Sequence, residues 1–241
     1  MIWLQPGKPA LFLCNWLTTS IYLPLSLRQT LAIHRAATKG RQGKGCVVIV
    51  PAGNANRPLD GIIFERNWGK DLPEGATQWL SGLALHPDVI TVAACTSYNQ
   101  KAAYSNWGSM VSVCAPSDNA IPCIWRSQQQ LIPTTPQADN LSGARVLKKE
   151  FEENGHGFGG TEFAAALVAG IAALTISANP NLTANQVREV LETTADKIID
   201  PNPDRQLGLE MGSYEDNGHS EWFGYGRVNA KQAVERAIHF E

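Results

Sequence analysis

The fold of this chain is decided around Gly160-Thr161-Glu162-Phe163-Ala164-Ala165, which opens an Ala-rich run that continues to Ser177. Alanine is the best helix former among the amino acids, so a helix is predicted over residues 162–177. The run is apolar on nearly all sides. The predicted helix should therefore lie in the core of the protein and not on its surface.

Four short apolar runs elsewhere in the chain show no alternation with polar residues, which is typical of strands buried on both faces. They are residues 10–14, 46–50, 89–94 and 111–114. Helical spacing predicts a helix over residues 27–39, ended by Gly40, and a short helix is expected over residues 77–85. Apolar strands with helices between some of them favour a mainly parallel α/β sheet covered on both faces.

Capping signals place two further helices near the C-terminus. Thr183 and Gln186 have the spacing of a capping box, and Asn229 is suited to cap a last helix that ends near His239. Residues 201–214 read as a polar loop. Residues 117–157 have no strong period, so a surface excursion or hairpin is expected there.

Composition favours one compact domain. The chain has 241 residues, 44% of them hydrophobic, and a formal net charge of −2, which gives no reason to expect binding to nucleic acid or to an anionic membrane. No run approaches the roughly 20 apolar residues of a membrane span, and the N-terminus does not read as a signal peptide. Five cysteines without metal-ligand spacing indicate reduced, buried thiols and a cytoplasmic location.

Several blocks of the sequence resemble the subtilisin-like serine peptidases, the subtilases. The run from Gly160 is similar to their nucleophile loop and central helix. Four other blocks follow the family's order: residues 51–54, 86–94, 104–108 and 224–230. The resemblance extends from about Leu11 to the end. It implies a three-layer, doubly wound, mainly parallel sheet that lacks the family's N-terminal strands, so residues 1–241 are expected to form a single partial domain.

The resemblance also implies roles for individual residues. Glu162 stands where the family carries its nucleophilic Ser, and Asn54 stands where an Asn completes the oxyanion hole. The family's Asp and His motifs are absent, and His34 lies in a predicted helix. We therefore expect a catalytically inactive homologue, because a carboxylate cannot replace an activated hydroxyl in forming a stable acyl-enzyme.

The same resemblance implies a peptide or protein ligand that adds a strand near Asn15, Trp16 and Leu17. Two alternatives stay open. Glu162 and a nearby His, with His156 as the candidate, could form the acid/base pair of a different hydrolase. Alternatively, the chain is a fragment of a broken or split peptidase gene. Glu162 itself could simply stabilise the start of its helix, and no metal ligand set or cofactor is predicted.

Loss of the neighbouring strands would leave the strand at residues 10–14 on an open edge. It would also uncover part of the central helix. An unpaired apolar edge strand is a template for pairing with another chain. We therefore expect the protein to associate with itself.

Overall fold

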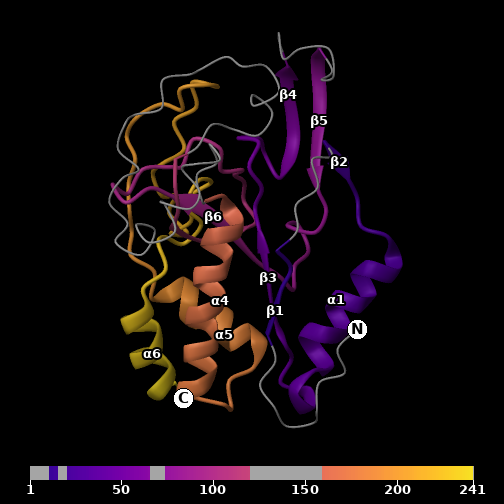
Figure 1. Ribbon diagram of the computed structural model, residues 1–241, viewed down its shortest axis with the longest axis vertical. Coiled ribbons are helices and arrows are strands. Elements are labelled where there is room, and N and C mark those ends of the chain that lie inside the picture. Colours follow the sequence, from indigo (N-terminus) through magenta and orange to yellow (C-terminus); the bar gives the residue numbers. More distant parts are fainter. Residues whose placement is uncertain (1–10, 16–20, 66–73, 120–158, 241) are drawn as a thin grey trace, which may run out of the picture.

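The main sheet contains four parallel strands in the order β1-β3-β6-β7 (Figure 1). The computed structural model of the protein describes residues 11–15, 21–65, 74–119 and 159–240. The strands are β1 Leu11–Leu13, β3 Val47–Pro51, β6 Ile90–Cys95 and β7 Val111–Pro116. The four predicted strands and their parallel arrangement are therefore confirmed.

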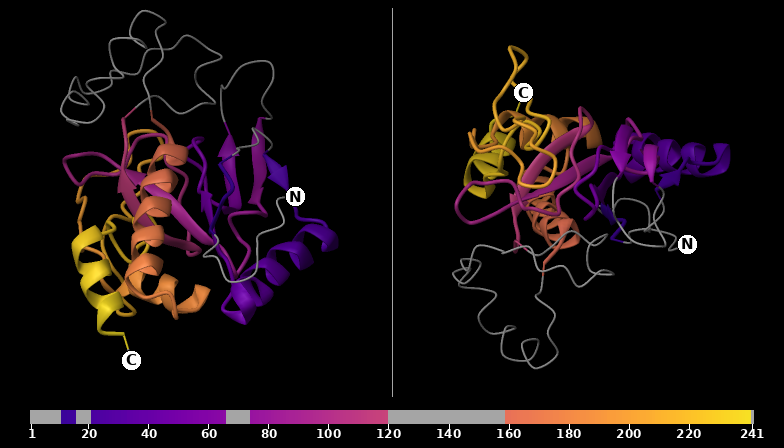
Figure 2. Two further views of the ribbon diagram at one scale, coloured as in Figure 1. Left: turned by 60° about the horizontal axis from the view of Figure 1, so that its bottom comes forward. Right: turned by 90° about the horizontal axis from the view of Figure 1, so that it is seen from above.

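Helices cover both faces of this sheet, as the three-layer prediction requires (Figures 1 and 2). One face packs against three helices, which are α4 Thr161–Ala178, α5 Ala184–Thr193 and α6 Ala230–Ile238. The other face packs against Ile33 of α1 (Leu27–Lys39) and against Trp222 and Phe223 of a C-terminal loop. Burial on both faces explains why the strands read as continuous apolar runs.

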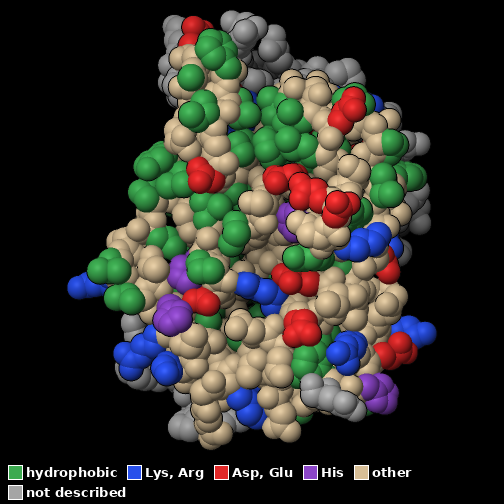
Figure 3. Space-filling view, turned by 180° about the vertical axis from the view of Figure 1, so that it is seen from behind, with side chains coloured by type: hydrophobic (Ala, Val, Ile, Leu, Met, Phe, Trp, Pro, Cys, Tyr) green, Lys and Arg blue, Asp and Glu red, His purple; other side chains and the backbone are tan. Residues whose placement is uncertain are grey.

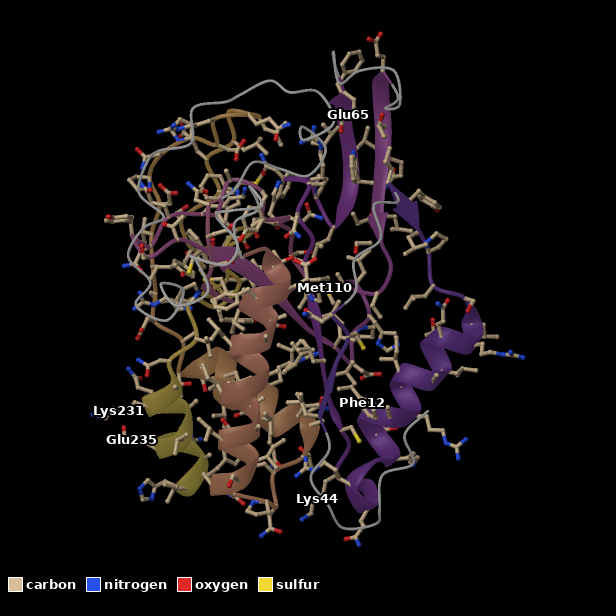
Figure 4. The ribbon with its side chains drawn as sticks, viewed as in Figure 1. Phe12, Lys44, Glu65, Met110, Lys231 and Glu235 are labelled. Carbon is tan, nitrogen blue, oxygen red and sulfur yellow. The ribbon has the colours of Figure 1, made fainter. Side chains whose placement is uncertain are left out.

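Successive residues of one strand serve the two faces in turn. Val47 and Ile49 of β3 pack on the side of α4, whereas Val48 and Val50 belong to the core on the side of Trp222. This division follows from the alternation of side chains along a strand. In β1, Leu13 packs on the side of α4 and Phe12 on the side of α1 (Figure 4).

The central helix α4 is confirmed as a core helix. Ala164, Ala165, Val168 and Ala172 are fully buried, and their small side chains let the helix lie close against the sheet. By length and composition alone α4 could also cross a membrane, although 44% of this 18-residue helix is buried inside the protein. The core helix of a soluble protein has the same composition, so this match does not point to a membrane.

The predicted helix caps are confirmed. Thr183 and Gln186 form a capping box at the start of α5, and the Asn229 side chain accepts from the backbone of Gln232 at the start of α6. Helix α1 has the bounds that its spacing predicts, but none of its residues is buried. Leu27 and Leu31 are 74% and 56% exposed.

A second, smaller sheet was not expected from the sequence. It consists of β2 Tyr22–Leu23, β5 Gly75–Ser81 and β4 Asp60–Glu65 in the order β2-β5-β4. The short helix predicted over residues 77–85 is therefore wrong. Thr77 and Trp79 are buried while Gln78 is exposed, which is the two-residue period of a strand, and antiparallel pairing with β4 satisfies the backbone.

Three other expectations concern edges, loops and thiols. β1 lies at one end of the main sheet, and within the described ranges it pairs with β3 alone.

Residues 201–214 form a loop without helix or strand, as predicted. Most of the excursion expected over residues 117–157 lies outside the described residues. The four described cysteines are free, with Cys14 half-buried and the others buried, and Cys123 is outside the description.

Candidate active site

The start of α4 holds Glu162 in a defined position. Gly160 precedes the helix with a φ of 98°, a conformation that L side chains rarely adopt, and Glu162 lies in the first turn. A Cβ atom at Gly160 would come within 2.4 Å of Glu162 Oε2. The backbone conformation therefore favours glycine here, and a side chain at this position would displace the Glu162 carboxylate.

The turn after β3 brings Asn54 against this helix start. Asn54 Oδ1 accepts hydrogen bonds from the backbone N–H of Thr161 at 2.8 Å and from its hydroxyl at 2.9 Å. Gly53 N donates to the same hydroxyl oxygen at 3.0 Å. Because Oδ1 is engaged in this way, the orientation of the amide is set and Nδ2 points the other way.

Asn54 Nδ2 donates to Glu162 Oε2 at 2.7 Å. The structure therefore brings together the two residues that were predicted at the nucleophile and oxyanion positions. In this geometry the carboxylate takes up the side-chain N–H that, by the resemblance, would face a substrate oxyanion. Negative charge is also favourable in the first turn of α4, where the helix dipole is positive.

A second set of hydrogen bonds, from residues other than Asn54, holds the backbone of Gly160. Tyr104 OH lies 3.0 Å from Gly160 N and donates to Ser117 Oγ at 2.7 Å, and Ser117 donates to Gly160 O at 3.0 Å. Asp118 Oδ1 is also 3.3 Å from Gly160 N. Burial, with the nearby Asp118 carboxylate, raises the pKa of Tyr104 well above its usual value, so this phenol stays neutral and hydrogen-bonded.

The remaining predicted residues are not gathered at this site. Asn15 lies two residues after the end of β1 and is exposed, whereas Trp16, Leu17 and His156 lie outside the described residues. His34 lies on α1, where its Nδ1 is 2.8 Å from Asp88 Oδ2. The role of a substrate-binding segment therefore stays a prediction.

Two other described histidines, His86 and His219, lie against backbone carbonyl groups. His86 Nε2 lies 3.1 Å from Thr30 O, and His219 Nε2 lies 2.8 Å from Val111 O. No hydrogen bond joins a histidine of the described ranges to Glu162. An acid/base pair would therefore have to come from His156, and nothing in the described geometry favours it.

Metal-ligating side chains do not cluster in the described part of the chain. Among residues 11–15, 21–65, 74–119 and 159–240, no group of three or more His, Cys, Asp or Glu side chains could hold a metal ion.

Sequence reasoning missed a buried polar network beside the Asn54 turn. Lys101 Nζ donates to Asn56 Oδ1 at 2.7 Å and lies 3.5 Å from Asp204 Oδ2, with both charged side chains less than 10% exposed. Burial lowers the pKa of Lys101 to about 8, although the Asp204 carboxylate opposes this shift. The sequence around Lys101 did not predict this network, because Asn56 and Asp204 are 148 residues apart in the chain.

A second buried ion pair anchors the smaller sheet. Arg57 donates two hydrogen bonds to Glu65 at the end of β4, from Nε at 2.6 Å and from Nη2 at 2.7 Å. Trp79 Nε1 donates to the same carboxylate at 2.9 Å (Figure 4 labels Glu65). Residues that follow Asn54 by a few positions are thus tied to the β4–β5 hairpin.

This fold and site define an α/β protein of the serine-peptidase kind. The model of the subtilase family matches residues 18–226. The chain belongs to the subtilase family.

Curated relatives agree with this assignment. The calcium-dependent protease of Trichormus variabilis is 35% identical over 220 residues, which make up 90% of this chain and 28% of that protein. Subtilisin E of Bacillus subtilis is 29% identical over 175 residues, or 73% of this chain and 34% of that protein. The chain therefore spans about a third or less of the length of these relatives.

Solved structures show the same fold. A serine protease of Aeromonas sobria matches with a TM-score of 0.60 and 16% identity over 96% of this chain and 44% of its own. A protease of Pseudoalteromonas arctica matches with a TM-score of 0.54 and 20% identity over 94% of this chain and 51% of its own. These likenesses support the subtilisin-like architecture.

Proposed function

We propose that this subtilase homologue does not hydrolyse peptides. We propose also that its own Glu162 carboxylate occupies the position where a substrate oxyanion would bind. The observation that carries the proposal is the 2.7 Å hydrogen bond from Asn54 Nδ2 to Glu162 Oε2. The nucleophile position holds a carboxylate, which does not form a stable acyl-enzyme with a peptide. The donor that would stabilise a tetrahedral intermediate is already engaged.

We further propose that the protein binds an extended peptide at the edge of β1 that no described strand covers. Leu11, Phe12 and Leu13 are all half-buried, so they offer apolar surface beside unpaired backbone groups. Cys14 N donates to Ile49 O at 2.9 Å, so by alternation the N–H of Leu13 points away from β3. Among the described residues none accepts from that N–H, so we propose that a peptide adding as a strand accepts from it.

Hydrolysis is tested with a fluorophosphonate probe and with fluorescein-labelled casein. We expect neither labelling nor cleavage of the wild-type protein, and none in Glu162→Ser, because a hydroxyl without a base partner stays weakly nucleophilic. Subtilisin E in the same assay is the positive control. Labelling of the wild-type chain would overturn the proposal.

Peptide binding is tested by fluorescence polarisation with an end-blocked, labelled hexapeptide of alternating Val and Thr. Leu13→Pro removes the outward N–H at an edge position where proline is tolerated, and it should abolish binding. Leu13→Ala keeps that N–H and is the matched control. Equal binding by both variants would show that the peptide does not add to β1.

A further inference from the structure

Lys101, Asn56 and Asp204 form a buried group in which each side chain contacts the other two. Lys101 Nζ donates to Asn56 Oδ1 at 2.7 Å, and Asn56 Nδ2 donates to Asp204 Oδ1 at 3.0 Å. Lys101 Nζ also lies 3.5 Å from Asp204 Oδ2. An amine, a carboxamide and a carboxylate are thus held within reach of one another.

The amine is close to the carbon atom of the carboxamide. Lys101 Nζ is 2.7 Å from Asn56 Oδ1. Because a C=O bond is about 1.23 Å long, Nζ lies no more than about 4 Å from Asn56 Cγ. Atoms that are poised to react are about 3–3.5 Å apart, so a small rotation of the lysine side chain is enough. The carboxamide is held in this orientation by Gln206, whose Oε1 accepts from Asn56 Nδ2 at 2.8 Å.

Water is largely excluded from the three groups. Asn56 is 1% exposed, Lys101 is 8% exposed, and the Asp204 side chain is 7% exposed. The centre of the Trp222 ring lies 5.7 Å from Lys101 Nζ. By contrast, charged side chains of both signs lie at the surface in Figure 3, where water solvates them. The contacts of Lys101 therefore form with little competition from water.

Burial also favours the neutral form of the amine. It lowers the pKa of Lys101 to about 8. The carboxylates of Asp204 and Asp200 oppose this shift, whereas the charge of Arg57 acts in the same direction as burial. The neutral amine is the nucleophile in acyl transfer, and a desolvated lysine supplies it at a lower pH than a lysine in water does.

We propose that Lys101 displaces the side-chain nitrogen of Asn56 and that an isopeptide bond forms between the two side chains. Asp204 takes a proton from the ammonium group, and the lone pair of Nζ then forms a bond to Asn56 Cγ. Asp204 returns this proton to Nδ2, and the Cγ–Nδ2 bond breaks. Nδ2 leaves as ammonia, which takes a second proton from Nζ and becomes ammonium. The carboxylate is regenerated, the total charge is unchanged, and no outside reactant is consumed.

The ion pair of Lys101 and Asp204 is the state before this reaction. The bond joins residues 45 positions apart and closes a covalent loop that contains β4, β5 and β6. A cross-link of this kind stabilises the folded state by restricting the unfolded chain. It also ties the turn that carries Asn54 to the segment after β6. The reaction itself uses neither Asn54 nor Glu162, so it does not depend on the proposed loss of hydrolysis.

Intact-mass spectrometry of the folded protein over time tests the proposal. We expect the wild-type mass to fall by one ammonia molecule. After digestion, the peptide that contains Asn56 should be joined to the peptide that contains Lys101. Wild-type protein recovered unfolded from inclusion bodies should keep its full mass in urea and lose ammonia only after the urea is removed, because the fold brings the groups together.

Three variants separate the roles of the side chains. Lys101→Arg keeps a buried cation but lacks the nucleophilic amine, so it should keep its full mass. Asp204→Asn removes the group that transfers the protons and should slow the reaction by about 10²-fold or more. Lys197→Arg, at a lysine that donates to two backbone carbonyl groups, is the matched control and should lose ammonia as the wild type does. Circular dichroism checks that each variant is folded.

Two results would overturn the proposal. The first is a full mass in the folded wild-type protein after prolonged incubation, without a joined peptide. The second is a loss of ammonia that persists in Lys101→Arg. That loss would come from cyclisation of an asparagine such as Asn217, which precedes Gly218, and hydroxylamine would cleave the chain there while leaving an isopeptide bond intact.

Discussion

Asn54 and Glu162 are 108 residues apart in the chain and meet through a hydrogen bond of 2.7 Å. The contact joins the turn after β3 to the first turn of α4. The two residues are those that the family resemblance predicts at the oxyanion and nucleophile positions, and the group predicted at the nucleophile position is a carboxylate.

Replacing Glu162 should lower stability by a modest amount. Glu162→Ala removes the acceptor of Asn54 Nδ2 and a negative charge from the N-terminus of α4, so the free energy of unfolding should fall by about 1–2 kcal/mol. Glu162→Gln keeps an acceptor oxygen, so it should lower the free energy of unfolding by less. Urea unfolding of both variants measures this, and a more stable Glu162→Ala would contradict it.

Asp204 should control acid stability. Burial alone would raise its pKa, but the Lys101 ammonium and N–H groups including those of Leu207 and Asn56 lower the pKa below 3.8. A lowered folded-state pKa contributes stability above pH 3.8 that is lost as pH falls through the folded value. Asp204→Asn should therefore reduce the loss of stability that occurs as the pH falls.

Asp204→Asn also leaves the buried Lys101 ammonium without its counter-charge, which should lower the free energy of unfolding at pH 7 by about 3–5 kcal/mol. Asp216→Asn, at an exposed position, is the matched control. Urea midpoints at pH 7 and below pH 4 give both quantities. Equal effects of the two substitutions would contradict the prediction.

Glu65 should hold the β4–β5 hairpin to the main sheet. Glu65→Gln keeps the shape of the side chain but leaves the Arg57 guanidinium buried beside a neutral amide. We expect a loss of about 3 kcal/mol or more, with faster hydrogen exchange in β4 and β5. Glu74→Gln, at an exposed residue just before β5, should change neither measurement.

The capping box of α5 should contribute measurably to stability. Thr183→Ala removes the side-chain oxygen that accepts from Gln186 N, so the free energy of unfolding should fall by about 1 kcal/mol. Thr193→Ala makes the same chemical change at an exposed position within the helix and should stay within about 0.5 kcal/mol. Thermal melts of the two variants are sufficient to compare them.

Periodicity and capping predicted most of the regular structure correctly, because both are local signals. The four strands of the main sheet are mostly apolar, and α5 and α6 begin directly after Thr183 and Asn229, the residues predicted to cap them. The hairpin of β4 and β5 was missed because its stability depends on contacts outside it. Arg57 and Trp79 both donate to Glu65, and no local pattern shows that pairing.

The sequence by itself determined the family and the parallel sheet, and it predicts Glu162 at the nucleophile position. These depend on short motifs whose order along the chain is enough to recognise them. Only the tertiary structure decided that Glu162 accepts from Asn54, that Lys101 is buried beside Asp204, and that α4 leaves Leu167 and Leu174 exposed. Each depends on distances between segments far apart in the chain, which local sequence does not encode.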